Sequence, residues 1–394
     1  MRVLHVTPYF APAFQYGGPP RSVLGLCRAL QQSGVEVEVY TTTANGSDPE
    51  LPPAMQTPVL CQDVPTRYFP LRPPRRFFCS RMASQLSRSL SSFDLVHIHT
   101  LWNLVSWPAA AAARRAHVPY VISPRGMLEG AARAHRRWRK RFAYPLIERH
   151  NLRNAALLHA TSEVERNTLG QLGLDVPICM LPNGIERLTD RKALRNRFRQ
   201  RLQLPADVPL IAWIGRIHPI KRLDLLASAF TQVWAVLPHA HLVIAGPDEN
   251  HYRARVQPLF RAVAKNVHWV GALESDGKQA LLADANALVV CSDTESFAMV
   301  VVEALAAGVP TVVTRNSPWQ KMETARCGYW TEHEPQAIVA ALLEVLTHPE
   351  MAASMGERAQ QLVKSEFLWS SIAAGMTQQY STVLEQFRGR RVVA

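Results

Sequence analysis

Two glutamates in the second half of the chain are spaced so that both could bind one elongated ligand. Glu295 lies in a short polar turn after the apolar run 287–291, and Glu303 follows eight residues later inside an apolar, helix-compatible run. The first turn of a helix carries unpaired N–H groups and a partial positive charge, which suit a phosphate. A ligand that reaches both glutamates and the helix start needs the length of a nucleotide-sugar.

Each carboxylate also has a simpler interpretation. Glu295 could cap the helix, and Glu303 could lie on a solvated face. Almost every neighbour of Glu303 between 300 and 307 is Val, Ala or Leu, however, so most faces of this helix are expected to be buried. A carboxylate in such surroundings needs a partner.

Two cations follow another apolar run in the same half of the chain. Arg216 and Lys221 come after residues 210–214 and flank a turn. Two cations at the end of a strand can neutralise a diphosphate, the Arg as a bidentate fork and the Lys as a point charge. Lys221 alone would fit an ordinary surface position. The pair, combined with the glutamate-bearing helix start, indicates a diphosphate site.

The elements that must position these residues alternate between strands and helices. The first half opens with a strand at 3–6, a helix with apolar residues at 23, 26, 27 and 30, and a strand at 35–39. The second half repeats the pattern with strands at 210–214, 241–245, 267–270, 287–291 and 309–313. This alternation predicts an α/β fold of two Rossmann-like, doubly wound parallel-sheet domains, with ligands at the carboxyl ends of the strands.

The predicted domain boundary lies in a polar, arginine-rich stretch, 189–203, which has no core periodicity. We expect a first domain at 1–190 and a second at 191–367. The final segment, 368–394, carries apolar residues at helical spacing and is expected to pack back on the first domain. A chain of 394 residues that is 47% hydrophobic can fill two such cores.

Polar residues also follow strands in the first domain. His99 ends the run 94–99, and Arg125 follows the run 118–123. We expect both at the ligand edge of the sheet, and we expect one of His97 and His99 to face a packed layer. Gly17 and Gly18 precede a helix and could let the backbone approach a phosphate. The GxGxxG fingerprint is absent, which argues against a dinucleotide dehydrogenase.

The net charge of +13 belongs entirely to the first half of the chain. Residues 1–203 contain 28 Lys and Arg against 13 Asp and Glu, whereas the remainder contains 16 against 18. The asymmetry indicates two units with different partners. The six cysteines form no CxxC pair, which argues against disulfides and structural zinc and for a reducing cytoplasm. No apolar run reaches the roughly 18 residues of a membrane span, and the apolar run at 3–6 is too short for a signal peptide.

The segment 133–153 concentrates eight Lys and Arg residues among aromatic and aliphatic side chains. Each cation near an anionic bilayer contributes about 1 kcal/mol of attraction, so this segment suits a membrane surface. Nucleic acid would also suit it, but helix-turn-helix, RNP and zinc-finger patterns are missing. We therefore expect an anionic membrane surface as the partner, no nucleic acid, and a cytoplasmic protein that is peripheral on the inner face of the cell membrane.

Two Rossmann-like domains, of which the second carries Arg216, Lys221 and the glutamates 295 and 303, resemble the family 4 glycosyltransferases, which have the GT-B fold. The resemblance spans nearly the whole chain. Gly17-Gly18 is similar to that family's N-terminal glycine loop, and the run 182–185 to its lead-in to the hinge. The runs 123–128 and 317–319 resemble the bacterial branch that builds capsular, O-antigen or exopolysaccharide chains.

The resemblance implies transfer of a hexose-type sugar, with retention of configuration, from a UDP- or GDP-sugar to a lipid-linked saccharide or lipopolysaccharide acceptor. Arg216, Lys221 and Glu295 would be the catalytic residues: the cations would stabilise the leaving diphosphate, and Glu295 would bind the donor sugar. The donor would also contact Gly17, Gly18, Gly246, Gly271, Phe297, Ala298, Met299 and Glu303.

Among these donor contacts, the N–H groups of 297–299 would bind sugar and phosphate, and Glu303 the ribose. Residues near Gly246 and Gly271 would line the base pocket. The first domain would bind the acceptor through His99 and Arg125. No metal or other cofactor is implied, because the two cations and the helix dipole would neutralise the diphosphate and no DxD-type site precedes the turn.

Two positions depart from the family pattern. Position 298 is Ala where the family more often has Gly, which predicts a tighter backbone approach to the donor. Arg125 stands where many relatives carry a histidine. A guanidinium cannot act as a base at neutral pH, so Arg125 would instead bind a phosphate or an acidic acceptor.

Two other classes of function remain open from the sequence. A nucleotide-sugar epimerase or a phosphorylase would keep the fold without the transfer. A non-enzymatic binder of nucleic acid or anionic membrane would depend on the basic segment alone.

Overall fold

The computed structural model describes residues 1–46, 49–71, 79–128 and 147–393, with the backbone alone at 390–393. The chain divides into two compact units. Unit 1 comprises Met1–Glu186 and Trp369–Ala394, and unit 2 comprises Arg187–Leu368. The boundary predicted at 190 lies a few residues later than this division. Thr189 already belongs to unit 2, where its N–H donates to Ala306 O (3.2 Å).

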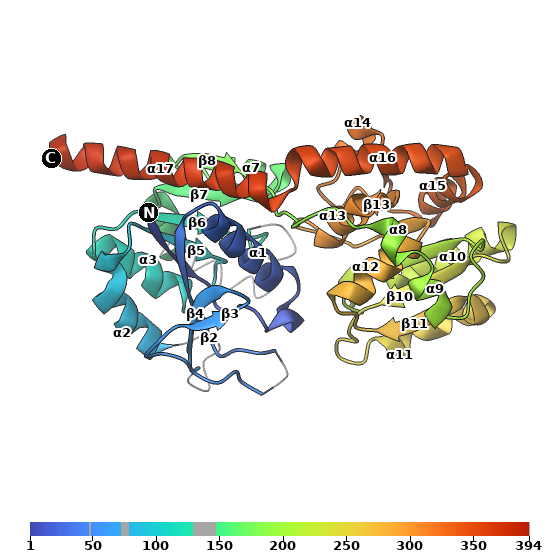
Figure 1. Ribbon diagram of the computed structural model, residues 1–394, viewed down its shortest axis with the longest axis horizontal. Coiled ribbons are helices and arrows are strands. Elements are labelled where there is room, and N and C mark those ends of the chain that lie inside the picture. The colour runs from blue at the N-terminus through green and yellow to red at the C-terminus, as the bar shows by residue number, and fades with distance from the viewer. Residues whose placement is uncertain (47–48, 72–78, 129–146, 394) are drawn as a thin grey trace. The chain divides into compact units, whose positions relative to one another are not determined.

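Unit 1 is built on an eight-stranded sheet in the order β3-β4-β2-β1-β5-β6-β7-β8 (Figure 1). All neighbouring strands are parallel except β3 and β4, which form an antiparallel hairpin at one edge. The strands are β1 (Arg2–Val6), β2 (Glu36–Thr42), β3 (Val59–Cys61), β4 (Val64–Phe69), β5 (Leu95–His99), β6 (Tyr120–Ser123), β7 (Leu157–Ala160) and β8 (Ile178–Met180).

The helices of unit 1 cover both faces of this sheet. They are η1 (Phe14–Tyr16), α1 (Gly18–Gln32), α2 (Ser80–Ser89), η2 (Leu90–Ser92), α3 (Ser106–Arg115), α6 (Arg149–Arg153), α7 (Glu163–Gly170) and α17 (Trp369–Val393). Alternate residues of a strand point to opposite faces. Val3 therefore packs with α1 and α17, whereas Leu4 packs with α2 and α3. Figure 1 shows α17 running beside α1 on the sheet.

Unit 2 is built on a six-stranded, fully parallel sheet in the order β11-β10-β9-β12-β13-β14. Its strands are β9 (Leu210–Ile214), β10 (His241–Ala245), β11 (Val267–Gly271), β12 (Ala287–Val290), β13 (Thr311–Thr314) and β14 (Gly328–Thr331). Two parallel sheets with crossover helices confirm the predicted pair of Rossmann-like domains.

The helices of unit 2 are α8 (Arg191–Leu194), α9 (Arg197–Arg201), η4 (Pro219–Lys221), α10 (Leu223–Val236), α11 (Arg253–Val256), η5 (Gln257–Asn266), α12 (Ser275–Asp284), α13 (Met299–Ala306), α14 (Lys321–Ala325), α15 (Pro335–Thr347) and α16 (Pro349–Glu366). One core joins α10, η5 and α15 to alternate residues of the strands. The α13 helix packs against β12 and β13. It follows β12 through the turn that holds Glu295.

Among the described residues, no single helix is both long and apolar enough to cross a membrane. The α15–α16 pair, which bends by 101° at its break, passes that test only when the two helices are taken together. Most of the basic segment, residues 133–146, lies outside the described residues.

Candidate functional site

The loop after β9 carries Arg216 and Lys221 at the carboxyl edge of the unit 2 sheet. Backbone hydrogen bonds hold this loop against the end of β10, where Ile217 N–H donates to Pro247 O (2.8 Å). His218 then caps the short helix η4, its Nδ1 accepting from Ile220 N–H (3.2 Å). Lys221 ends η4, so its position depends on these fixed turns.

Lys221 and Glu295, predicted as partners at one site, form an ion pair. The Ser292 hydroxyl donates to the same carboxylate oxygen, Oε1 of Glu295 (2.6 Å). The two loops are tied together because Asp293 N–H donates to Ile220 O (2.8 Å). An ammonium has three protons, so one bond to Glu295 leaves Lys221 able to donate to a ligand.

Arg216 makes a different ion pair. Its Nη1 contacts Glu249, which follows β10, and 39% of the Arg216 side chain remains exposed. A surface pair of this kind contributes roughly 0–1 kcal/mol, so it is readily exchanged for a ligand anion. Both cations thus leave the same sheet edge, and each has a carboxylate partner.

The N-terminus of α13 is anchored beside these residues by the buried Phe297. Its ring packs against Trp319 and Phe367, and its carbonyl accepts from Trp319 Nε1–H (2.5 Å). Ala298 precedes the helix with φ 60° and ψ 74°, the left-handed region. Met299 begins the helix, where first-turn N–H groups lack intrahelical acceptors. The family more often has glycine at position 298, and the alanine of this chain adopts the left-handed conformation that glycine adopts without strain.

Glu303 has the partner that its apolar surroundings required. Lys278 on α12 lies 2.5 Å from its Oε1, and both side chains are about one-fifth exposed. The pair leaves the second carboxylate oxygen of Glu303 without a hydrogen-bond partner among the described residues. Glu303 therefore combines a fixed position with a free acceptor.

Gly246 follows β10 and Gly271 ends β11, and the two are hydrogen-bonded, from Gly246 N–H to Gly271 O (2.7 Å). Gly246 has φ 152°, and a Cβ there would lie 1.7 Å from Gly215 O. This clash alone explains the glycine at 246. A base pocket between these two positions stays a prediction.

The other predicted donor glycines, Gly17 and Gly18, belong to unit 1, and their contact with the donor stays a prediction. Gly17 has φ 89° and precedes α1, which Gly18 begins. Pro19 and Pro20 occupy the first turn of that helix. Proline fits there because the first-turn N–H groups are unpaired in any case.

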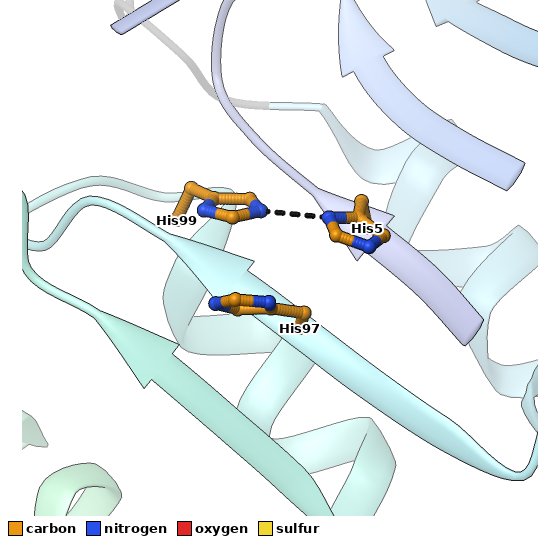
Figure 2. A group of neighbouring side chains, drawn as sticks. All are labelled: His5, His97 and His99. Carbon is orange, nitrogen blue, oxygen red and sulfur yellow. Dashed lines mark hydrogen bonds between the residues drawn. The ribbon is translucent and has the colours of Figure 1, made fainter. Parts of the chain in front are cut away.

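Unit 1 contains a buried histidine cluster that the sequence only partly indicated. His5, His97 and His99 lie together at the ends of β1 and β5, with the rings of His97 and His99 stacked at 4.2 Å (Figure 2). All three are fully buried. The expectation that only one of His97 and His99 faces a packed layer was wrong. Residues i and i+2 of a strand share a face, so both lie under α1 and α17.

The hydrogen bonds of this histidine cluster assign its protons. Arg125 Nε–H donates to His99 Nδ1 (3.2 Å), so the His99 proton sits on Nε2 and donates to His5 Nδ1 (2.9 Å). His5 then carries its proton on Nε2, a buried atom with no partner among the described residues. Each ring is neutral in this arrangement.

A second chain of bonds runs from β7 to α17. His159 Nε2–H donates to Leu181 O (2.8 Å), which leaves His159 Nδ1 to accept from Ser123 Oγ–H (2.7 Å). Ser123 Oγ accepts from His97 Nε2–H (2.6 Å), and His97 Nδ1 accepts from the Tyr380 hydroxyl (2.6 Å). In this assignment every ring N–H and hydroxyl O–H of the chain donates to an acceptor.

Burial keeps these histidines neutral. It lowers the pKa of His5 and of His159 to about 3, and Arg125 adds to both shifts. Burial likewise holds the pKa of His97 and His99 well below the ordinary value, helped by the neighbouring histidines and Arg125. Every ring therefore carries one proton at neutral pH.

The three rings of Figure 2 place nitrogen atoms within 4.8 Å of one another, which is close enough for metal ligands. His97 and His99, however, use both ring nitrogens in hydrogen bonds, and only His5 Nε2 is open. Arg125 adds a positive charge beside His99 and no carboxylate offsets it within 4 Å among the described residues. The donor set therefore fits a hydrogen-bonded support better than a metal centre.

Two family descriptions match the chain. Residues 17–184 match the glycosyl transferase 4-like domain, and residues 195–362 match the glycosyl transferases group 1 domain. The chain belongs to the family 4 glycosyltransferases. The enzyme class predicted from its charged residues is thereby confirmed.

Curated relatives of this glycosyltransferase are named for inositol phosphate or for a phosphatidylinositol monomannoside. It is 27% identical over 98% of its length to D-inositol 3-phosphate glycosyltransferase 2 of Catenulispora acidiphila, of which it covers 95%. It is 28% identical over 50% of its length to a GDP-mannose-dependent monoacylated alpha-(1-6)-phosphatidylinositol monomannoside mannosyltransferase of Corynebacterium glutamicum, of which it covers 54%.

Solved structures confirm the GT-B fold of this glycosyltransferase. Sucrose-phosphate synthase from Thermosynechococcus elongatus matches with a TM-score of 0.77 at 20% identity, over 98% of this chain and 99% of that one. HepE from Anabaena, solved with UDP-glucose, matches with a TM-score of 0.74 at 17% identity, over 97% of this chain and 100% of that one.

Several residues of this glycosyltransferase that contact the predicted site were not predicted. Ser292 lies in the polar turn that precedes Glu295, so its hydroxyl could have been predicted from the sequence as a site residue. Glu249 and Lys278 come from other loops and helices, and only the fold brings them to Arg216 and Glu303. His5 and Tyr380 join His97 through sheet register and the return of α17.

Proposed function

We propose that this glycosyltransferase moves a hexose-type sugar, with retention of configuration, from a UDP- or GDP-sugar to a lipid-linked saccharide or lipopolysaccharide. The acceptor class follows from the sequence resemblance to the bacterial polysaccharide-assembly branch. The relatives named for inositol phosphate and phosphatidylinositol mannoside support an acceptor that carries phosphate. The common chemistry is a sugar or polyol hydroxyl on a phosphate-bearing molecule.

The observation that carries the donor part of the proposal is the Lys221–Glu295 ion pair beside the N-terminus of α13. In this proposal Lys221 and Arg216 bind the diphosphate and stabilise the charge that develops on it as the sugar leaves. Glu295 orients Lys221 and accepts hydrogen bonds from sugar hydroxyls. The free N–H groups of α13 bind the phosphate, and Glu303 binds the ribose with its open oxygen.

The proposed reaction needs no metal ion or other cofactor. Two cations and a helix N-terminus supply the positive charge that a divalent ion would otherwise supply to a diphosphate. The proposed donor is a UDP- or GDP-hexose, and residues near Gly246 and Gly271 would line the pocket for its base.

A transfer assay tests the proposal. Purified protein is incubated with radiolabelled UDP- and GDP-sugars and a membrane-lipid extract, and label in the lipid fraction is measured. Lys221→Ala should abolish labelling, whereas Lys265→Ala, an exposed lysine of η5, should leave it intact. Absence of both donor binding and transfer with every nucleotide-sugar would refute the proposal.

The same incubation separates the other enzymatic classes. An epimerase would convert the donor without an acceptor, and a phosphorylase would need inorganic phosphate or release a sugar phosphate. Product analysis of the water-soluble fraction distinguishes all three reactions. The intact set of Arg216, Lys221, Glu295 and Glu303 favours transfer over a non-enzymatic binding role.

We also propose that the enzyme works on the cytoplasmic face of the cell membrane, held there by the basic segment 133–153. The support is its composition, with no role for nucleic acid. Sedimentation with anionic and neutral lipid vesicles tests the idea. Replacement of Arg136, Arg137 and Arg139 by Gln should reduce binding to anionic vesicles, and equal binding to both vesicle types would refute it.

A further inference from the structure

Arg125 is a cation in the buried layer of unit 1 whose described partners are all neutral. Its Nε donates to His99 Nδ1 (3.2 Å), and its Nη1 donates to Ser22 Oγ (3.0 Å) and Asn183 Oδ1 (2.9 Å). Only 8% of the residue is exposed. Burying a charge without an opposite charge is costly, so an arginine held in this way calls for an anion.

One part of the guanidinium has no protein partner. Nη2 donates no hydrogen bond to a described residue, and this atom is not completely buried. It therefore reaches solvent. The charge of Glu165 raises the pKa of Arg125, but the two form no ion pair within 4 Å, and Glu165 accepts from Gly126 N–H (2.6 Å) and Thr161 N–H (2.7 Å) instead.

The positive end of a helix lies over the same guanidinium. Ser22, which accepts from Arg125, is in the first part of α1, and its hydroxyl donates to Pro19 O (3.2 Å) in the first turn. The 15-residue helix α1 begins at Gly18, and because Pro19 and Pro20 have no N–H, its contribution is the helix dipole and the N–H of Gly18, which add to the charge of Arg125. The open Nη2 of Arg125 is an observation independent of the helix.

The backbone and the histidine cluster hold Arg125 in place. Arg125 has φ 53°, a left-handed conformation that costs an arginine energy and persists only where the surroundings impose it. His99 accepts from Nε, and the neutral rings of the histidine cluster below it exclude any competing anion from that side. An anion can therefore approach the guanidinium only from its solvent-facing side.

We propose that Arg125, with the N-terminus of α1, forms a receptor for an anionic group, a phosphate or a carboxylate, on the substrate that unit 1 binds. The inference rests on the proposed glycosyl transfer and deepens it by naming the substrate as anionic at this position. Arg125 is the ligand-binding group, and Ser22, Asn183 and His99 are positioning residues.

Two sources can supply this anionic group, and paired probes distinguish them. A phosphate on the acceptor is tested with myo-inositol 1-phosphate against myo-inositol. A carboxylate on the acceptor sugar is tested with glucuronate against glucose. Inorganic phosphate serves as the general probe, and UDP reports on the separate donor site in unit 2.

The experiment measures the dissociation constant of each probe by calorimetry for the full chain and for three variants. Arg125→Gln is expected to weaken anionic probes by about tenfold or more, the effect of removing a charge-assisted hydrogen bond, and to leave neutral probes and UDP unchanged. The affinity of Arg125→Lys for the anionic probes should lie between those of the wild type and Arg125→Gln, because lysine keeps the charge but lacks the planar guanidinium. Arg115→Gln, which removes an exposed arginine of α3, should behave as the wild type.

The outcomes separate this inference from the proposed function. An Arg125-dependent preference for inositol phosphate identifies the anion as a phosphate, and one for glucuronate identifies it as a carboxylate. The inference is overturned if neither anionic probe is preferred, or if Arg125→Gln binds them as the wild type does. Should Arg125→Gln fail to fold, Arg125→Lys takes its place, and the inference is overturned if this variant binds the anionic probes as tightly as the wild type. Failure of UDP itself to bind would instead overturn the proposed function.

Discussion

Lowering the pH from 7.5 to 5.5 is expected to destabilise unit 1 by about 5 kcal/mol. Four histidines, His5, His97, His99 and His159, are buried in neutral form with pKa values far below 6.5. In the unfolded chain they titrate near 6.5. The unfolded state therefore binds more protons at pH 5.5, and stability, fully present above about pH 6.5, is lost as the pH falls.

The magnitude follows from proton linkage. A group with an unfolded pKa of about 6.5 that stays neutral in the fold costs about 1.4 kcal/mol at pH 5.5 and about 0.1 kcal/mol at pH 7.5. Four such groups give about 5 kcal/mol, which is comparable with the entire stability of many domains. Unit 2 has two partly buried histidines with lowered pKa values, His241 and His268, so its loss should be smaller.

Methionine oxidation provides an assay that reports on each unit separately and works at both pH values. Met82 and Met376 are buried in unit 1, and Met322 and Met355 are buried in unit 2. Peroxide oxidation across a urea series, read by mass spectrometry, gives an unfolding midpoint at each methionine. With a urea slope of about 2–3 kcal/mol per molar, the unit 1 midpoint should fall by about 2 M.

A variant sharpens the test. His5→Gln removes one titrating group, so the pH-dependent loss at Met82 and Met376 should shrink by about a quarter whatever the variant does to absolute stability. The reasoning is refuted if the unit 1 midpoints move no more than those of unit 2, or if His5→Gln leaves the difference between the two pH values unchanged.

Three further predictions concern single groups. Lys221→Ala should lower kcat by about 10²–10³, since it removes a transition-state cation, and a rate within twofold of Lys265→Ala in the transfer assay would contradict this. Ala298→Gly should stabilise unit 2 by about 0.5–1 kcal/mol by relieving a left-handed alanine, seen as a higher midpoint at Met322; a lower midpoint would count against strain. Excess EDTA should change the transfer rate less than twofold, and a loss restored by a divalent metal would show that the proposed metal-free donor site is incomplete.

The elements that carry the unit 2 site were predictable because their signals are local. The turn and helix around Glu295 are defined by a polar stretch between two apolar runs, and Arg216 and Lys221 lie close together in sequence. The need of Glu303 for a partner also followed from its neighbours. The identity of that partner, Lys278, depends on how α12 packs on α13, and no local pattern encodes that contact.

The histidine cluster shows where sequence reasoning stopped. His97 and His99 stood out because they end one strand, but their common face was misjudged. His5 reaches them only because β1 pairs with β5 in a register that sets His5 opposite His97. Tyr380 arrives from α17, 283 residues along the chain from His97. Long-range register and helix return decide such a cluster, and neither is visible in residue spacing.

The return of α17 to unit 1 has a consequence for biosynthesis. Unit 2 is complete once residue 368 has left the ribosome. Unit 1 is not, because the hydrogen bond from the Tyr380 hydroxyl to His97 Nδ1 can form only after Tyr380 has been synthesised. At about 5–20 residues per second, roughly 10–40 s separate the synthesis of residue 186 from that of Tyr380. During that interval the nascent unit 1 sheet exposes the apolar face that α17 later covers. The inserted unit should therefore fold first, and the unit that begins the chain should be the one that needs chaperone protection.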